Sequence, residues 1–215
     1  MVRVNALPTE WLRADIDDGL ATGLTAIVLP KAESTVGLDA VAAMLDAAGH
    51  PGLGILAGIE TALGVADARP LLAHPRVVAA YFGAEDFIAD MAGVRTGSND
   101  EVAYARGAVA VAARLAGVPV LDQVVTDFRN GERFEREAHE ARAMGYAGKL
   151  CIHPDQVAIA NDAFVPSAEE IDRARRLLAA YETASASGVA AIDFEGQMVD
   201  EPLAAQARRI LALAD

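Results

Sequence analysis

The stretch that decides the fold is ILAGIETALGVADARPLLAHPRVVAAYFGAEDFIADM, residues 55–91. Two short apolar runs, Gly54–Ile59 and Val77–Phe82, are flanked by Gly or Pro and have the length of strands. The segment between them, Thr61–His74, has the apolar spacing of a helix. A strand–helix–strand unit of this kind predicts a parallel sheet or barrel.

Each apolar run leads into a carboxylate, Glu60 after the first and Asp86 after the second. Because the carboxyl ends of parallel strands form the active face of such folds, we expect these two acids side by side. Oxygen ligands of this kind suit Mg²⁺, which commonly takes one or two carboxylates together with water and substrate oxygens. Alternatively, Glu60 and Asp86 are acids in loops or at helix N-caps, an interpretation that the pattern supports equally well.

Composition narrows the class of protein and of partner. The chain has 215 residues and is 53% hydrophobic and only 5% aromatic, as in an α/β protein with Ala-rich helices. Its net charge of −13 argues against nucleic acid or an anionic membrane as a partner, because phosphates require clustered Lys and Arg. With no signal-peptide pattern, no membrane span and one cysteine, Cys151, the cytoplasm is the expected compartment.

Strands and helices alternate along the chain. We predict a (β/α) domain over residues 1–166 and C-terminal helices with a lid segment over residues 167–215. An eight-stranded (β/α)₈ barrel would need two more units, expected before Met1, and a doubly wound open sheet is the alternative. The six predicted strands are Val2–Asn5, Thr25–Leu29, Gly54–Ile59, Val77–Phe82, Val118–Val125 and Gly148–Ile152.

Several motifs in order resemble the citrate lyase β-subunit-like branch of the HpcH/HpaI aldolase superfamily, which includes malyl-CoA and citramalyl-CoA lyases. They are VRVN, VLPKAES, GIETALG, FGAEDFIADMAG, CIHPDQ and GQMVDEP. The resemblance covers essentially the whole chain. It implies a TIM-type (β/α)₈ barrel, here lacking its first two βα units, with a C-terminal helical lid. It also implies Mg²⁺-dependent cleavage or formation of a carbon–carbon bond between an acyl-CoA and a 2-keto acid of the oxaloacetate, pyruvate or glyoxylate type.

The resemblance also implies roles for individual residues. Glu60 and Asp86 would bind the metal, and Glu60 and Arg3 would contact the substrate, with Arg3 on the carboxylate and keto oxygen of the keto acid. Asp200 would be the lid carboxylate that closes over a neighbouring subunit's site and shuttles a proton. By pattern alone, Arg3 is an edge residue and Asp200 a turn acid. Lys31 and Glu33 are interpreted as an ion pair at the end of a strand, outside the site.

One departure from the family pattern concerns the start of the chain. Family members normally begin with two further strands, the second ending in a DLED-like motif, and nothing of that kind precedes Arg3. We expect the exposed sheet edges to be compensated by assembly into a homo-oligomer, a trimer or hexamer. Two alternatives to a lyase remain: a malyl-CoA thioesterase or malate synthase-type activity at the same site, and a catalytically impaired, shortened paralogue that serves as an oligomer subunit.

Overall fold

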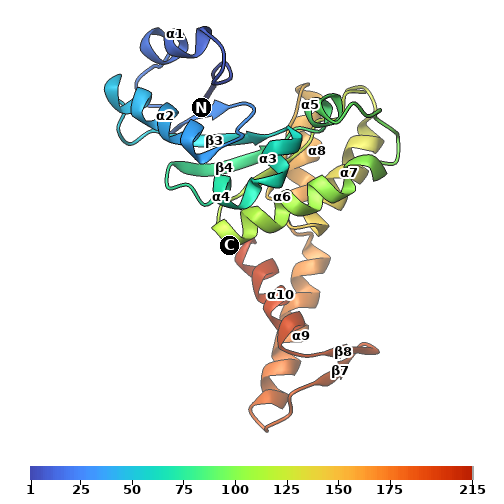
Figure 1. Ribbon diagram of the computed structural model, residues 1–215. Helices are drawn as coiled ribbons and strands as arrows, with labels where there is room; N and C mark the ends of the chain where they lie inside the picture. Colours follow the sequence, from blue (N-terminus) through green and yellow to red (C-terminus); the bar gives the residue numbers. More distant parts are fainter. Residues whose placement is uncertain (215) are drawn as a thin grey trace. The chain divides into compact units, whose positions relative to one another are not determined.

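A computed structural model describes residues 1–214 of the chain (Figure 1). The chain divides into two compact units, unit 1 (Met1–Ala160) and unit 2, which begins at Asn161. Within the described residues, no helix is both long and apolar enough to cross a membrane.

A parallel sheet forms the centre of unit 1. Its six strands follow one another in the order of the sequence, and every neighbouring pair is parallel. Each predicted strand segment contains one of these strands, although several of the strands are shorter than expected. The strands are β1 (Val2–Arg3), β2 (Ala26–Leu29), β3 (Gly54–Ile59), β4 (Val77–Phe82), β5 (Val120–Asp122) and β6 (Gly148–Lys149).

The sheet is an open half-barrel, so the expectation of an eight-stranded TIM-type barrel is wrong for this chain. In the described residues β1 pairs only with β2 and β6 only with β5, and the sheet therefore has two free edges. The doubly wound alternative is also wrong, because a strictly sequential strand order has no point at which the direction of winding reverses. Right-handed crossovers then place all connecting helices on the same face, as in a barrel.

The helices of unit 1 form a layer on that face. In sequence order α1 contacts α2, α2 contacts α4, and α4 contacts α6 (Figure 1). The helix predicted between β3 and β4 is broken at Asp67, because Pro70 cannot donate the hydrogen bond that a continuous helix needs. The helices are α1 (Trp11–Asp18), α2 (Thr35–Ala47), α3 (Ala62–Ala66), α4 (Ala68–Leu72), α5 (Ala84–Asp90), the 3₁₀ helix η1 (Asp100–Val102), α6 (Ala103–Ala116), α7 (Gly131–Ala143) and α8 (Asp155–Phe164), which begins in unit 1.

The two faces of the sheet differ in burial. Residues that point toward the helices are fully buried, among them Ile55, Ile59 and Phe82. The opposite face carries a smaller apolar cluster of Leu56, Ala79 and Tyr81, packed against the partly buried Val28, Leu121 and Leu150. The concave inner face of the half-barrel is therefore less covered than the outer face.

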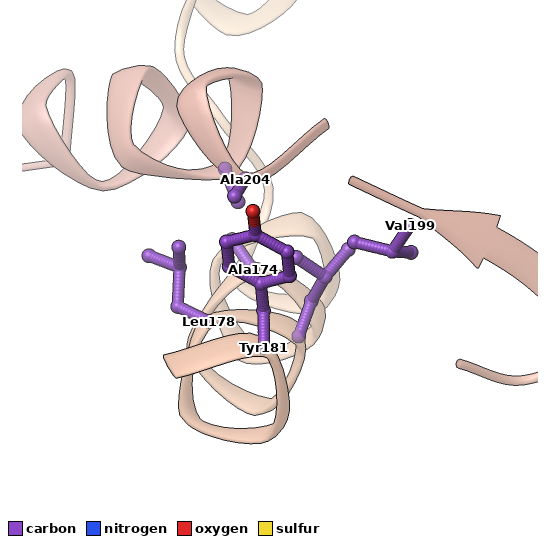
Figure 2. Packing of buried hydrophobic residues seen from close by; sticks show 7 residues of the cluster. Ala174, Leu178, Tyr181, Val199 and Ala204 are labelled. Atoms are coloured by element: carbon purple, nitrogen blue, oxygen red, sulfur yellow. The ribbon is translucent and has the colours of Figure 1, made fainter. Parts of the chain in front are cut away.

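Unit 2 is built from two helices and a hairpin. A small apolar core joins them, and Figure 2 shows the Tyr181 ring of α9 close to Ala204 of α10 and to Val199 of β8. The hairpin turns at Glu195 and Gly196, both at positive φ, as a tight two-residue turn requires. The elements are α9 (Ala168–Ser185), β7 (Ile192–Phe194), β8 (Gln197–Val199) and α10 (Glu201–Ala212).

Candidate metal and substrate site

The candidate site lies where β2, β3 and β4 end. Glu60 directly follows β3, Lys31 lies two residues after β2, and Asp86 lies in the first turn of α5, which follows β4. Because the three strands are adjacent and parallel, their carboxyl ends lie at one edge of the sheet. The structure thus brings Glu60 and Asp86 to the same edge, as the sequence led us to expect.

Gly83 provides the space that the Glu60 side chain occupies. A Cβ atom at residue 83 would lie 2.5 Å from Glu60 Oε2 and 2.7 Å from Glu60 Cβ, closer than real Cβ contacts allow. The backbone of Gly83 has φ −107° and ψ 92°, which any residue adopts. Glycine is therefore needed here for space and not for conformation.

The Glu60 carboxylate is buried yet not fully neutralised by its surroundings. Its Oε1 accepts a hydrogen bond from the backbone N–H of Lys31 at 3.1 Å. Burial raises the pKa of Glu60 above its ordinary value and the Asp86 charge raises it further, whereas the Tyr81 hydroxyl and the Arg3 guanidinium lower it. A carboxylate in this setting would gain from a nearby cation.

Asp86 is more exposed and is paired with Lys31. The Lys31 ammonium lies 3.0 Å from Asp86 Oδ1. This hydrogen bond, with the charge of Asp86, raises the pKa of Lys31. Lys31 therefore contacts both carboxylates, which corrects its interpretation as a residue outside the site. The VLPKAES motif around Lys31 does not indicate these contacts, because they depend on which strand lies beside β2.

Tyr81 is a second residue of the site that the sequence analysis missed. It is paired in register with Gly58, and a Cβ atom at residue 58 would lie 2.4 Å from the Tyr81 hydroxyl oxygen. Among the described residues the hydroxyl has no hydrogen bond of ordinary geometry, although it is buried beside Glu60. Burial and the Glu60 charge raise the pKa of Tyr81, so the hydroxyl stays protonated. The sequence feature that could have indicated Tyr81 is an aromatic residue with a hydroxyl group near the end of an apolar strand.

Arg3 lies within electrostatic reach of this group. It is an exposed residue of β1, and its charge lowers the pKa of both Glu60 and Tyr81. Arg3 also pairs in register with Val28, which lies against the inner-face cluster. The structure thus places Arg3, Glu60 and Asp86 in one neighbourhood, in which the guanidinium would be available to an anionic substrate.

The donor set fits a magnesium ion. In the part of the chain that the structure describes, no three His, Cys, Asp or Glu side chains are grouped to hold a metal. A thiolate or imidazole site of the zinc type is therefore not present in those residues. Two carboxylates, with the other positions left to water and substrate oxygens, match the usual coordination of Mg²⁺.

Asp200, the remaining predicted site residue, belongs to unit 2. It lies between β8 and α10, at the N-cap of that helix. Its Oδ1 is buried and has no hydrogen-bond partner among the described residues, and its charge contributes to the raised pKa of the Tyr181 hydroxyl. Asp200 thus has a carboxylate oxygen, Oδ1, that is free to accept a hydrogen bond. The structure describes its position relative to the other residues of unit 2.

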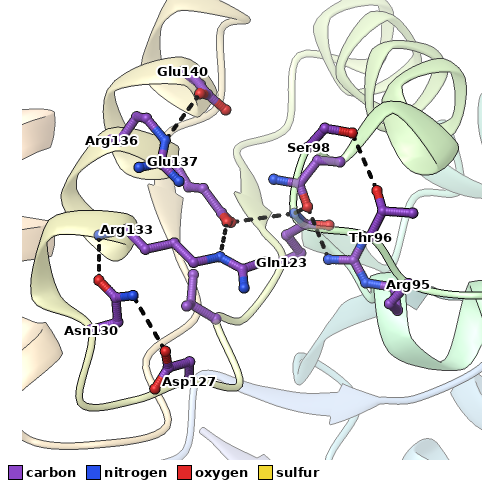
Figure 3. A network of polar contacts seen from close by, with 12 residues as sticks. Arg95, Thr96, Ser98, Gln123, Asp127, Asn130, Arg133, Arg136, Glu137 and Glu140 are labelled. Atoms are coloured by element: carbon purple, nitrogen blue, oxygen red, sulfur yellow. Dashed lines mark hydrogen bonds and ion pairs between the residues drawn. The ribbon is translucent and has the colours of Figure 1, made fainter.

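A buried ionic network supports the sheet beyond the site, and Figure 3 shows one end of it, where Glu137 meets Arg133 and Gln123. Asp122, at the end of β5, accepts two hydrogen bonds from Arg106 at 3.0 Å each and one from the Lys149 ammonium at 2.7 Å. Lys149 also lies 3.5 Å from Glu137, which accepts a hydrogen bond from Arg133. Because every charge in the group has an opposite partner, we assign this network to the structure of the sheet and not to chemistry.

Comparison with known proteins identifies related chains. The family model described as HpcH/HpaI aldolase/citrate lyase matches residues 1–154, a range that contains Arg3, Glu60 and Asp86 but not Asp200. A citrate lyase subunit beta-like protein of Deinococcus radiodurans is 48% identical over 211 residues, which are 98% of this chain and 74% of that protein. A (3S)-malyl-CoA thioesterase of Cereibacter sphaeroides is 35% identical over 215 residues, with 100% and 74% covered.

Solved structures agree with these sequence matches. The crystal structure of CitE from Mycobacterium tuberculosis in complex with magnesium, acetoacetate and coenzyme A is similar, with a TM-score of 0.86 and 33% identity. The similarity covers 99% of this chain and 77% of the other. This chain thus spans about three quarters of the length of the proteins it resembles.

Proposed function

This chain belongs to the HpcH/HpaI aldolase/citrate lyase family, and we propose that it is a Mg²⁺-dependent carbon–carbon lyase. Its substrate would be a 3-hydroxyacyl-CoA of the citramalyl-CoA, malyl-CoA or citryl-CoA type. Its products would be an acyl-CoA and a 2-keto acid such as pyruvate, glyoxylate or oxaloacetate. The cytoplasm remains the expected location.

The observation that carries the proposal is the pair of strand-end carboxylates, Glu60 and Asp86, joined by Lys31 and lying in the field of Arg3. The CitE structure, 33% identical to this chain, holds magnesium together with acetoacetate and coenzyme A. Its ligands are thus a divalent cation, a keto acid and the acyl carrier. A divalent cation and a keto acid suit a site made of two carboxylates and a guanidinium.

The residues divide the chemistry between them. Glu60 and Asp86 would hold Mg²⁺, which when bound supplies Lewis-acid stabilisation of the charge that develops on the hydroxyl or keto oxygen. Arg3 would bind the carboxylate of the keto acid through its planar guanidinium. As the carbon–carbon bond breaks, the hydroxyl group gives up its proton to solvent and its carbon becomes the keto carbon. The electron pair of the broken bond passes to the α-carbon of the acyl-CoA, which then takes up a proton. Asp200 would supply that proton.

A second activity at the same site is favoured by one observation, the 35% identity to a (3S)-malyl-CoA thioesterase. Hydrolysis would release free CoA and malate, whereas lyase cleavage leaves the thioester intact. The products therefore separate the two activities directly. A third possibility, a non-catalytic subunit, would bind neither Mg²⁺ nor a keto acid.

The experiment that tests the proposal is a lyase assay on citramalyl-CoA and malyl-CoA, first with Mg²⁺ and then with EDTA. It follows both keto-acid release and free thiol. We expect metal-dependent release of keto acid that is abolished by Glu60→Gln, because the neutral amide is a poor Mg²⁺ ligand. Glu135→Gln, on the exposed side of α7, removes the same charge away from the site and is the matched control. Thiol release without keto acid would instead identify a thioesterase.

The subunit arrangement is tested by complementation. We propose a homo-oligomer, a trimer or hexamer, in which Asp200 of one copy serves the Glu60 site of another. Mixing Glu60→Gln with Asp200→Asn would then restore part of the activity, since some sites would combine two intact residues. Full activity in a strictly monomeric wild-type preparation would contradict this arrangement.

A further inference from the structure

Lys31 contacts both carboxylates of the candidate site through two different groups. Its backbone N–H donates to Glu60 Oε1 at 3.1 Å, and its side-chain ammonium lies 3.0 Å from Asp86 Oδ1. These two contacts come from one residue just after β2, whereas Glu60 directly follows β3 and Asp86 lies in α5. Lys31 is thus a bridge between the two acids.

The backbone of Lys31 holds an uncommon conformation. Its φ is 53°, in the left-handed region, which residues other than glycine seldom adopt. The next residue, Ala32, donates its N–H to the Gly58 carbonyl at 2.9 Å, which ties the segment to β3. Such conformations persist where the surroundings enforce them and often mark functional positions. Here the conformation is found at the residue that reaches both acids.

We propose that Lys31 acts as a resident cation of the site. It neutralises Asp86 when no metal is bound and competes with Mg²⁺ for Asp86 Oδ1. This inference rests on the proposed function, since it takes Glu60 and Asp86 as the metal ligands. It adds a determinant of metal affinity from a residue that is not itself a metal ligand.

The exposure of the pair makes this competition feasible. The side chains of Lys31 and Asp86 are 47% and 45% exposed, so the ion pair is one that water and salt can exchange. The hydrogen bond to Glu60 comes from the backbone N–H of Lys31 and does not require the Lys31 side chain. A divalent cation can therefore displace the ammonium while the Glu60 contact persists. The cost of displacing the ammonium would weaken the apparent affinity for Mg²⁺.

The test measures Mg²⁺ binding by isothermal titration calorimetry on full-length protein stripped with EDTA, without substrate. Because exposed ion pairs contribute little, we expect Lys31→Met to bind Mg²⁺ roughly two- to fivefold more tightly than wild type. Lys31→Arg keeps the cation and should stay within about twofold of wild type. Lys31→Gly removes the same side chain and tolerates positive φ, so it serves if Lys31→Met fails to fold.

A charge control and three outcomes complete the design. Arg13→Met removes another exposed cation, paired with Asp17 in α1, and should leave the Mg²⁺ affinity unchanged. Tighter binding in Lys31→Met or Lys31→Gly, absent in Arg13→Met, supports the role of Lys31. Unchanged or weaker binding in both Lys31 variants overturns this role while leaving the Mg²⁺ site intact. No Mg²⁺ binding by wild type at millimolar concentration overturns the proposed function and this inference together.

Discussion

Replacing Gly83 by Ala tests whether the Glu60 carboxylate is as tightly confined as the structure indicates. The new Cβ would lie 2.5 Å from Glu60 Oε2, which is 0.9 Å short of the 3.4 Å at which ordinary van der Waals contact begins. The backbone at Gly83 already suits alanine, so the effect comes from the collision alone. Glu60 must move, and its hydrogen bond from Lys31 is then strained or lost.

The size of the effect follows from these contacts. Forcing extra volume into a packed region costs about 1–3 kcal/mol of the free energy of unfolding. Displacement of Glu60 also removes a ligand from its place, so we expect Mg²⁺ binding to weaken by at least about tenfold, on the order of 1.4 kcal/mol. Urea denaturation measures the first quantity, and calorimetric titration with Mg²⁺ measures the second.

The control is Gly52→Ala, a glycine that has no atom within 4 Å of its added Cβ. Because alanine restricts the unfolded chain, this variant should be neutral or slightly more stable than wild type. If Gly83→Ala matches Gly52→Ala in both stability and Mg²⁺ affinity, Glu60 is not confined by Gly83. The geometric argument for the site would then be refuted.

Two further predictions concern stability. Lys149→Met leaves Asp122 and Glu137 without their shared buried cation, so the free energy of unfolding should fall by about 3 kcal/mol, measured by urea denaturation; a fall below about 1 kcal/mol would contradict a structural role. The pKa of Glu101 is about 2, because hydrogen bonds from Thr96 to its carboxylate outweigh burial, which alone would raise it. Because the pKa of Glu101 is lower in the folded state, its ionised carboxylate stabilises the protein at pH values above the unfolded pKa, near 4.5. This stabilisation is lost as the pH falls from 4.5 toward 2. The free energy of unfolding, obtained from thermal denaturation, should therefore fall by about 1–3 kcal/mol less in Glu101→Gln than in wild type over this pH range. An equal fall in the two proteins would contradict this role of Glu101.

The alternation of strands and helices was predictable because it depends on local pattern. Apolar or extended segments identified all six strands of the sheet. Gly54–Ile59 and Val77–Phe82, the two apolar runs flanked by Gly or Pro, have bounds that match the structure. The helix between those two runs was predicted as continuous, yet it is broken at Asp67. Pro70 is the local signal of that break.

The lateral contacts of the strands were beyond the reach of the sequence pattern. The family resemblance implied a (β/α)₈ barrel, whereas the six strands of the described residues form an open sheet, and a count of strands does not show how a sheet curls. The buried network around Asp122 was also missed, since Arg106 and Lys149 are far apart in sequence and meet only through helix packing and strand register. Contacts of this kind depend on tertiary neighbours.

The candidate site shows the same division. The sequence by itself placed Glu60 and Asp86 at the ends of strands, because an acid directly after an apolar run is a local feature. Only the tertiary structure decided that Lys31 contacts both acids and that Tyr81 lies beside Glu60. The physical reason is that strand pairing sets which residues face each other, and a hydrogen bond or ion pair forms only when two atoms from different strands come within about 3 Å.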